Sequence, residues 1–186
     1  VQKGLIAVEP ASGAELWRTE FPYRTSTAAS PVVSGDVVYC SAGYGVGAAA
    51  WRIDQKDGAF VPELLWRAAN KNINHWSTPV VHDGHLYGMF SFKEYGKGPL
   101  RCIELETGEE KWAEAGFGPG NVILVGGTLV ALSDKGELVL IDPRPDAYHE
   151  LARADVLPGK CWSMPAFADG AVYLRSTQES VRIDLK

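Results

Sequence analysis

Residues 5–17 read Leu5-Ile6-Ala7-Val8-Glu9-Pro10-Ala11-Ser12-Gly13-Ala14-Glu15-Leu16-Trp17, and this order of an apolar run, an acidic residue, a glycine and a tryptophan recurs along the chain. The later copies are Arg52-Ile53-Asp54 with Gly58 and Trp66, Cys102-Ile103-Glu104 with Gly108 and Trp112, Leu140-Ile141-Asp142 with Leu151 in the tryptophan position, and a partial copy at Arg182-Ile183-Asp184. A short repeated unit cannot bury its own apolar face, so such units stack on their neighbours. The sequence therefore predicts an array of similar modules.

A second pattern of paired apolar strands lies between these copies and sets the period. Its equivalent positions are Tyr39, Tyr87, Val130 and Tyr173, at steps of 48, 43 and 43 residues. Repeats of about 40 to 50 residues are typical of four-stranded propeller blades. Short strands rich in Val, Leu, Ile and Tyr alternate with glycine-containing turns, and no segment shows helical periodicity. We therefore expect an all-β fold, a partial β-propeller of four-stranded antiparallel blades with about four blades, half of an eight-bladed ring.

The same spacing predicts the blade boundaries. We expect one partial propeller over residues 1–186, with a blade remnant at 1–20, blades at 28–67, 76–114 and 120–153, and an incomplete blade at 162–186. The chain opens in the middle of one repeat and closes after the third strand of another. An unpaired strand edge exposes backbone donors and acceptors, so we expect a missing upstream propeller half, or a second copy of the chain, as partner.

Composition argues against several classes of protein. The chain has a formal net charge of −5 and no run of Lys or Arg, which argues against a nucleic-acid partner. No apolar run reaches the roughly 20 residues that a membrane-spanning helix needs. Its three cysteines, Cys40, Cys102 and Cys161, include no CxxC pair, and we expect them to be unpaired, small apolar residues.

The repeat itself explains the most regular side chains. Large rings at a fixed place in a repeat are usually packing residues, so we assign structural roles to Trp17, Trp66 and Trp112 and to the turn residues Gly13, Gly58 and Gly108. The recurring carboxylates that follow the third strand of each blade favour a role in stabilising turns. We therefore predict neither catalytic residues nor a metal site in this segment.

The loops that join successive blades, and those between the second and third strands, gather on one face of a propeller. We expect that face to carry a set of mostly aromatic and cationic ligand-binding candidates: Arg24, Tyr44, Asn74, His75, Trp76, Lys93, Tyr95, Lys160 and Trp162. Such side chains suit an anionic, sugar-like or peptide ligand. Trp76 and Trp162 hold equivalent places before Pro79 and Pro165, so packing within the repeat is the alternative interpretation of both.

The copies at residues 5–17 and 102–112 resemble the Ala-x-Asp-x-x-Thr-Gly-x-x-x-Trp motif of quinoprotein-type propellers. More closely, residues 121–142, 150–154 and 159–165 are similar to the C-terminal part of secreted bacterial PQQ-binding-like propeller proteins. That family shares its repeat with pyrroloquinoline quinone (PQQ) dehydrogenases and with the scaffold lipoprotein of the outer-membrane assembly complex. The resemblance implies a propeller in which the repeated tryptophans pack between blades, and a periplasmic or secreted location.

Three functions are compatible with this resemblance. The first is a non-catalytic extracytoplasmic scaffold that binds a protein or carbohydrate ligand. The second is half of a PQQ-dependent alcohol or sugar dehydrogenase, and the third is a carbohydrate-binding or carbohydrate-active propeller. PQQ and Ca²⁺ are implied only by the resemblance, and the vicinal cysteine pair of the dehydrogenase pattern is absent from this sequence. Fold alone does not determine function, and we favour the scaffold because neither metal ligands nor a Cys-Cys pair can be assigned in this sequence.

Overall fold

The computed structural model describes residues 4–22, 24, 28–69, 74–90 and 93–185, and all regular elements in this part of the chain are β-strands. Residues 1–3, 91–92 and 186 belong to the ranges predicted above and lie outside the described residues. Accordingly, no helix of the described chain could cross a bilayer. The all-β prediction is confirmed.

The strands form five antiparallel sheets in which neighbours along the chain pair with each other. The sheets are β1 (Leu5–Val8) with β2 (Glu15–Thr19); β3 (Val32–Ser34), β4 (Val37–Ala42), β5 (Gly47–Lys56) and β6 (Ala59–Ala68); β7 (Val80–His82), β8 (His85–Met89), β9 (Leu100–Glu104) and β10 (Glu110–Glu114); β11 (Asn121–Val125), β12 (Thr128–Leu132), β13 (Glu137–Asp142) and β14 (His149–Asp155); and β15 (Ala166–Ala168), β16 (Ala171–Arg175) and β17 (Ser180–Asp184).

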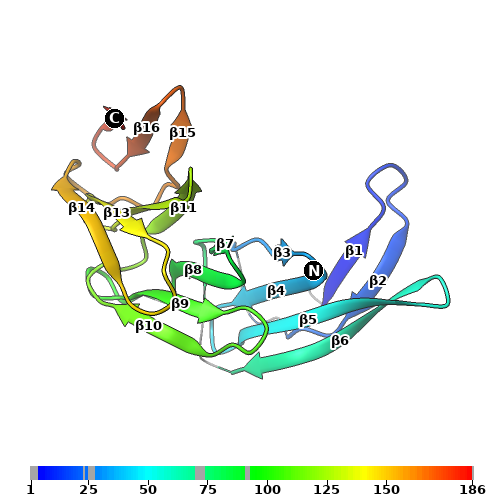
Figure 1. Ribbon diagram of the computed structural model, residues 1–186. Coiled ribbons are helices and arrows are strands. Elements are labelled where there is room, and N and C mark those ends of the chain that lie inside the picture. Colours follow the sequence, from blue (N-terminus) through cyan, green and yellow to red (C-terminus); the bar gives the residue numbers. More distant parts are fainter. Residues whose placement is uncertain (1–3, 23, 25–27, 70–73, 91–92, 186) are drawn as a thin grey trace.

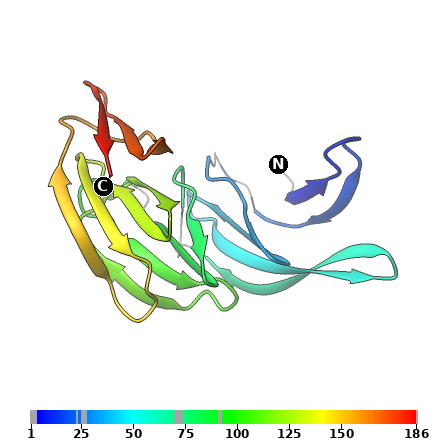
Figure 2. The ribbon, with the colours of Figure 1, turned by 45° about the horizontal axis from the view of Figure 1, so that its top comes forward.

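The sheets follow one another around an open arc (Figures 1 and 2). The first strands of the sheets, such as β7 and β11, lie on the concave side of the arc, and the last strands, such as β10 and β14, lie on the convex side (Figure 1). This order of strands from the centre outwards is that of propeller blades.

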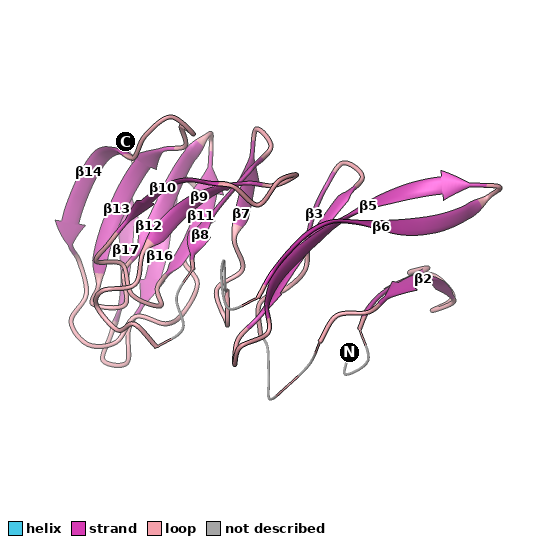
Figure 3. Cartoon of the chain, turned by 90° about the horizontal axis from the view of Figure 1, so that it is seen from below, coloured by secondary structure: helices cyan, strands magenta, loops and turns pink. Residues whose placement is uncertain are grey.

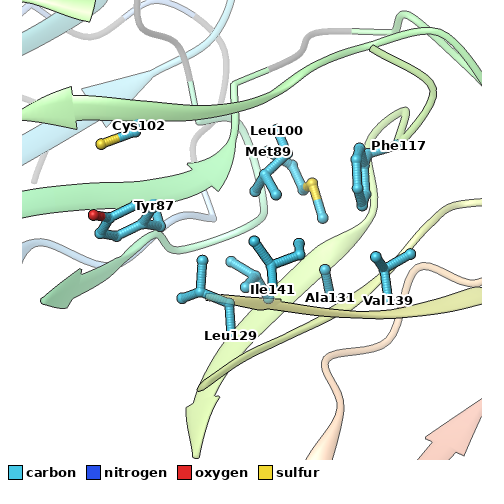
Figure 4. Close-up of a cluster of buried hydrophobic side chains, with 10 residues drawn as sticks. Tyr87, Met89, Leu100, Cys102, Phe117, Leu129, Ala131, Val139 and Ile141 are labelled. Atoms are coloured by element: carbon cyan, nitrogen blue, oxygen red, sulfur yellow. The ribbon is translucent and has the colours of Figure 1, made fainter. Parts of the chain in front are cut away.

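Apolar side chains fill the spaces between consecutive sheets. One cluster joins Tyr87, Met89 and Leu100 of the β7–β10 sheet to Val139 and Ile141 of the β11–β14 sheet, and the two groups face each other (Figure 4). Three further clusters occupy the other sheet-to-sheet contacts. Because strands β4, β8 and β12 are buried on both faces, the three four-stranded sheets depend on their neighbours for a core.

The repeated tryptophans lie between neighbouring sheets. Trp66 on β6 donates its indole Nε1–H to the Leu105 carbonyl at 2.8 Å, and Trp112 on β10 donates to the Arg144 carbonyl at 2.7 Å. Each acceptor follows the third strand of the next sheet. All three tryptophans are half-buried against the clusters, and Trp17 packs against the cluster that contains Trp51.

The repeated glycines have positive φ but do not all make the same turn. Gly13 and Gly108 donate their backbone N–H to the carbonyls of Glu9 and Glu104, at 2.8 and 2.9 Å. Gly58 instead lies with Asp57 in the tight turn that closes the β5–β6 hairpin, where Lys56 pairs with Ala59. A two-residue Asp-Gly turn suits the twist of a hairpin because both residues adopt positive φ.

The β5–β6 hairpin is longer than the corresponding hairpins of the next two sheets. Strands β5 and β6 have ten residues each, whereas β9, β10, β13 and β14 have five to seven. The extra pairs lie near the tight turn, where Phe60 and Val61 favour extended backbone. The hairpin consequently projects beyond the other sheets (Figure 3).

The cysteines lie in the cores, unpaired, as expected. Cys40, Cys102 and Cys161 are all buried and free. Burial raises the pKa of the Cys40 and Cys102 thiols to about 11, so both stay protonated near neutral pH.

Candidate functional site

Five aromatic side chains from four loops form a continuous row, named here the aromatic row: Tyr44, His75, Trp76, Trp162 and Tyr95. Tyr44 and His75 meet edge to face with ring centroids 5.2 Å apart, and His75 lies 5.0 Å from Trp76. Trp76 lies 5.8 Å from Trp162, which stacks on Tyr95 at 5.8 Å and 27°. These separations and orientations are those of attractive aromatic pairs.

The loops that carry the row are those expected from the propeller topology. Tyr44 and Tyr95 lie between the second and third strands of their sheets, in the β4–β5 and β8–β9 loops. Trp76 and Trp162 lie in connections from one sheet to the next, before β7 and before β15. Tertiary packing thus joins side chains that are up to 118 residues apart in the sequence, the separation between Tyr44 and Trp162.

Lysine ammonium groups lie over two of these rings. Lys93 Nζ is 5.9 Å from the Tyr44 centroid, and Lys160 Nζ is 5.0 Å from the Trp162 centroid. Both distances fall in the range of cation–π attraction. The row therefore combines aromatic faces with positive charge.

Buried hydrogen bonds hold the middle of the row in place. Asn74 is fully buried: its Oδ1 accepts from the Tyr39 hydroxyl at 2.7 Å, and its Nδ2 donates to the Met89 carbonyl at 3.1 Å. Trp76 donates its Nε1–H to the Pro119 carbonyl at 3.2 Å. The side chain of Asn74 thus acts as an internal anchor of the row.

Two residues of the site have a backbone conformation that their side chains disfavour. Tyr44 has φ 57° and Lys93 has φ 66°, both in the left-handed region. The other described non-glycine residues with positive φ are aspartates, Asp57, Asp83 and Asp169. Asp tolerates this region in turns, whereas Tyr and Lys enter it less readily, and such strain is concentrated at functional sites.

His75 is the titratable group inside the row. It is 9% exposed, and burial together with the nearby Lys93 charge lowers its pKa below the ordinary value. The imidazole is therefore neutral at pH 7. It contributes an aromatic surface and polar nitrogens, with no additional charge.

The open end of the row borders a pocket of about 500 Å³. Its lining residues are Tyr95, Asp134, Lys135, Gly159, Lys160 and Trp162. The carboxylate of Asp134 is 7% exposed and accepts from the Gly96 N–H with both oxygens, at 3.1 and 2.9 Å. Burial raises its pKa from the ordinary value, against the opposite effect of the Gly96 hydrogen bond.

Asp134 and Lys135 were not among the sequence candidates. They lie between β12 and β13, the loop that corresponds to those carrying Tyr44 and Tyr95. That correspondence could have identified them from the repeat alone. Their short, turn-like loop has no aromatic residue comparable to Tyr44 or Tyr95, on which the prediction for the other loops depended.

The structure brings seven of the nine predicted residues into one connected group, with Asn74 beneath it. Arg24 is exposed, and no hydrogen bond or ring contact among the described residues joins it to the row. Trp76 is half-buried and Trp162 is 42% exposed, so packing and exposure coexist along the row.

The donor atoms of the site do not fit the quinone–calcium centre implied by the wider quinoprotein group. Ca²⁺ takes six to eight oxygen ligands, and the described residues contain no group of three or more His, Cys, Asp or Glu side chains suited to a metal ion. The pocket offers one carboxylate, from Asp134, whose oxygens accept from Gly96. The chemistry available at the row is therefore recognition by aromatic faces and ammonium groups.

Comparison with solved structures supports the propeller architecture. The crystal structure of BamB from Moraxella catarrhalis superposes with a TM-score of 0.70 at 15% identity, over 97% of this chain and 51% of that one. The computationally designed Ika8 protein superposes with a TM-score of 0.70 at 14% identity, over 100% of this chain and 53% of that one. The chain thus spans about half the length of both structures.

Sequence comparison assigns the family. No curated protein matches the chain significantly by sequence. Residues 1–115, however, match the model of a PQQ-repeat family described as outer membrane protein assembly factor BamB. That match covers more than half of the chain, and the superposed structures have the same architecture. The chain therefore belongs to the BamB-like family of PQQ-repeat β-propellers.

Proposed function

We propose that this chain is a non-catalytic binding scaffold that presents the aromatic row to a ligand outside the cytoplasm. The observation that carries the proposal is the continuity of the row, in which five rings from four loops are in successive contact. Rigid sheets support these loops, so little conformational entropy is lost when a ligand binds.

The family supports the proposed location. The matched family is described by an outer-membrane assembly factor, and the first superposed structure is a BamB protein. We infer an extracytoplasmic site of action for this chain by analogy with that family. The test is a fusion of the full-length protein to a reporter enzyme that folds only after export. A reporter that stays inactive in the source organism contradicts the inference.

The exposed end of the row offers the sharpest test of binding. Tyr95 is 51% exposed and Trp162 is 42% exposed, although both belong to the stacked pair. Arrays of saccharides and of peptides first identify a ligand that the wild-type chain binds. We expect a Tyr95→Ala/Trp162→Ala double variant to lose binding to that ligand.

A matched control is available on the last sheet. Phe167 and Tyr173 are 42% and 41% exposed, on β15 and β16, and neither lines the pocket. A Phe167→Ala/Tyr173→Ala variant removes a similar exposed apolar area and is expected to keep binding. Equal loss in both variants, or unchanged binding in both, contradicts a role for the row.

A further inference from the structure

We propose that the pocket at the end of the aromatic row binds an acidic oligosaccharide, recognised through sugar rings stacked on Tyr95 and Trp162 and carboxylates paired with Lys135 and Lys160. The proposal rests on the binding function proposed above and specifies the ligand of that site. Three observations support it: the pocket is lined by lysines, its aromatic rings are exposed, and backbone groups around it are hydrogen-bonded within the protein.

The pocket is locally basic on an acidic protein. The chain as a whole has a net charge of −5. A second hollow of about 370 Å³, lined by Lys93, Glu94, Tyr95, Lys97 and Pro99, shares Tyr95 with the first. The linings of the two hollows together contain four lysines and two acidic residues. Local positive potential attracts an anionic ligand and raises its rate of association.

Neither lysine of the main pocket forms an ion pair within the described chain. Lys135 and Lys160 are exposed, and Lys160 Nζ lies over the Trp162 ring. The acidic residue of the lining, Asp134, accepts hydrogen bonds from Gly96, and the nearby Lys135 charge partly offsets the burial that raises its pKa. Both ammonium groups thus lack a direct carboxylate partner in the described chain and can pair with the carboxylates of a ligand.

The backbone groups around the pocket are largely used within the protein, which disfavours an extended peptide as ligand. Lys160 N donates to the Thr177 hydroxyl at 3.2 Å, and its carbonyl accepts from Thr177 N at 3.0 Å. Cys161 N donates to the Asp134 carbonyl at 3.0 Å. Peptides that add to a strand edge obtain their affinity from such main-chain bonds. Recognition here must come mainly from rings and ammonium groups.

Exposed, nearly parallel rings are suited to the flat apolar faces of sugars. Tyr95 and Trp162 are inclined by only 27° and retain 51% and 42% exposure. Trp and Tyr side chains provide a large apolar surface with a polar group at one end, as the partly apolar, partly hydroxylated face of a sugar requires. A pocket of about 500 Å³ lies within the range of ligand sites. The second hollow, which shares Tyr95 with the first, gives space for further sugar units.

Tetragalacturonate, a carboxylated oligosaccharide, is the probe, and binding to the whole chain is followed by calorimetry and by tryptophan fluorescence at low salt. We expect Trp162→Ala and a Lys135→Gln/Lys160→Gln double variant each to weaken binding at least tenfold, and added salt to weaken wild-type binding. Trp162→Phe retains a ring and is expected to keep most of the affinity. The Phe167→Ala/Tyr173→Ala variant is expected to bind as the wild type does.

Two comparison probes distinguish the outcomes. Maltotetraose tests the need for carboxylates, and hexaglutamate tests charge without sugar rings. Any of three results overturns the saccharide proposal. The first is that the wild-type chain does not bind tetragalacturonate, and the second is that it binds hexaglutamate with equal affinity. The third is that Trp162→Ala leaves tetragalacturonate binding unchanged. If a peptide from the arrays binds through the row while the saccharide does not, the binding function stands and its ligand is a protein. If the row variants change no binding at all, both proposals fail.

Discussion

The indole of Trp112 lies at a contact between two sheets, whereas the indole of Trp162 lies on the loop face. Trp112 contacts Tyr87 of its own sheet and Tyr148 of the next, and donates to the Arg144 carbonyl. Trp162 contacts Trp76, Tyr95 and Lys160 and remains 42% exposed. The same side chain thus joins sheets at the repeated position, and at the loop position it lines a pocket. Three pairs of substitutions and one pH comparison test how packing positions and exposed positions differ in this chain.

The largest expected effect is that of Trp112→Ala. Removing this indole opens a gap between two sheets and leaves the Arg144 carbonyl without its donor, so we expect the free energy of unfolding to fall by about 3 kcal/mol. Trp162→Ala is expected to cost less than about 1 kcal/mol, since its ring is partly in solvent. Denaturant unfolding of both variants measures the difference. Equal losses would show that the loop-face indole is equally important for packing.

The second comparison concerns two repeated glycines. Gly108 has φ +73°, and a Cβ there would lie 2.7 Å from the Trp66 indole, whereas Gly58 has φ +81° with no atom within 4 Å of such a Cβ. We expect Gly58→Ala to cost about 1 kcal/mol from backbone strain alone, and Gly108→Ala about 2 kcal/mol because the indole must also move. Thermal unfolding of the two variants provides the measurement. If Gly58→Ala lowered the stability more than Gly108→Ala, the close approach of Trp66 would not explain why position 108 requires glycine.

A third comparison uses tyrosines at equivalent positions of the repeat. Tyr87 is fully buried and donates its hydroxyl to the Pro143 carbonyl at 2.8 Å, whereas Tyr173 is 41% exposed. Tyr87→Phe removes a buried hydrogen bond and is expected to lower the free energy of unfolding by about 1 kcal/mol. Tyr173→Phe is expected to change it by less than about 0.5 kcal/mol. The expectation fails if the exposed position proves to be the more sensitive one.

The smallest expected effect is a dependence on pH. Because burial and the Lys93 charge lower the pKa of folded His75, the folded state binds a proton less readily than the unfolded chain does. The stability that this neutral histidine provides is present above the unfolded pKa of about 6.5 and is lost as the pH falls towards the lower folded value. Wild-type stability should therefore fall more steeply between pH 7.5 and 5.5 than that of His75→Gln.

A substitution of Lys93 controls this pH experiment. Lys93→Gln removes one of the two causes of the lowered pKa and should make the slope shallower. Identical slopes in the wild type and His75→Gln would contradict a lowered pKa for His75.

Much of the fold could be predicted because the repeat encodes it locally. The apolar runs at residues 122–125 and 129–132 and the Gly126-Gly127 turn between them predict a hairpin, and the structure has β11 and β12 there. The length of the β5–β6 hairpin was not predictable in the same way. The residues around Asp57-Gly58 are compatible with both a loop and a continued strand, and pairing with the partner strand decides between them.

The candidate site was partly predictable for a related reason. Strand order determines which loops share a face, so Tyr44, Trp76 and Trp162 could be assigned to one side of the molecule. Their order of contact, the buried position of Asn74 and the pocket beside Asp134 depend on how the sheets lean against each other. Sequence spacing within one repeat contains no information about that angle.

By itself, the sequence determined the repeating unit, its four-strand plan and the residues that join one sheet to the next, because alternation, turns and tryptophan spacing are properties of neighbours along the chain. Only the tertiary structure decided that rings from four separate loops meet in one row and that one end of the row is open beside lysines. Contacts between distant loops depend on the relative positions of whole sheets, which are set by the packing of the buried clusters between them.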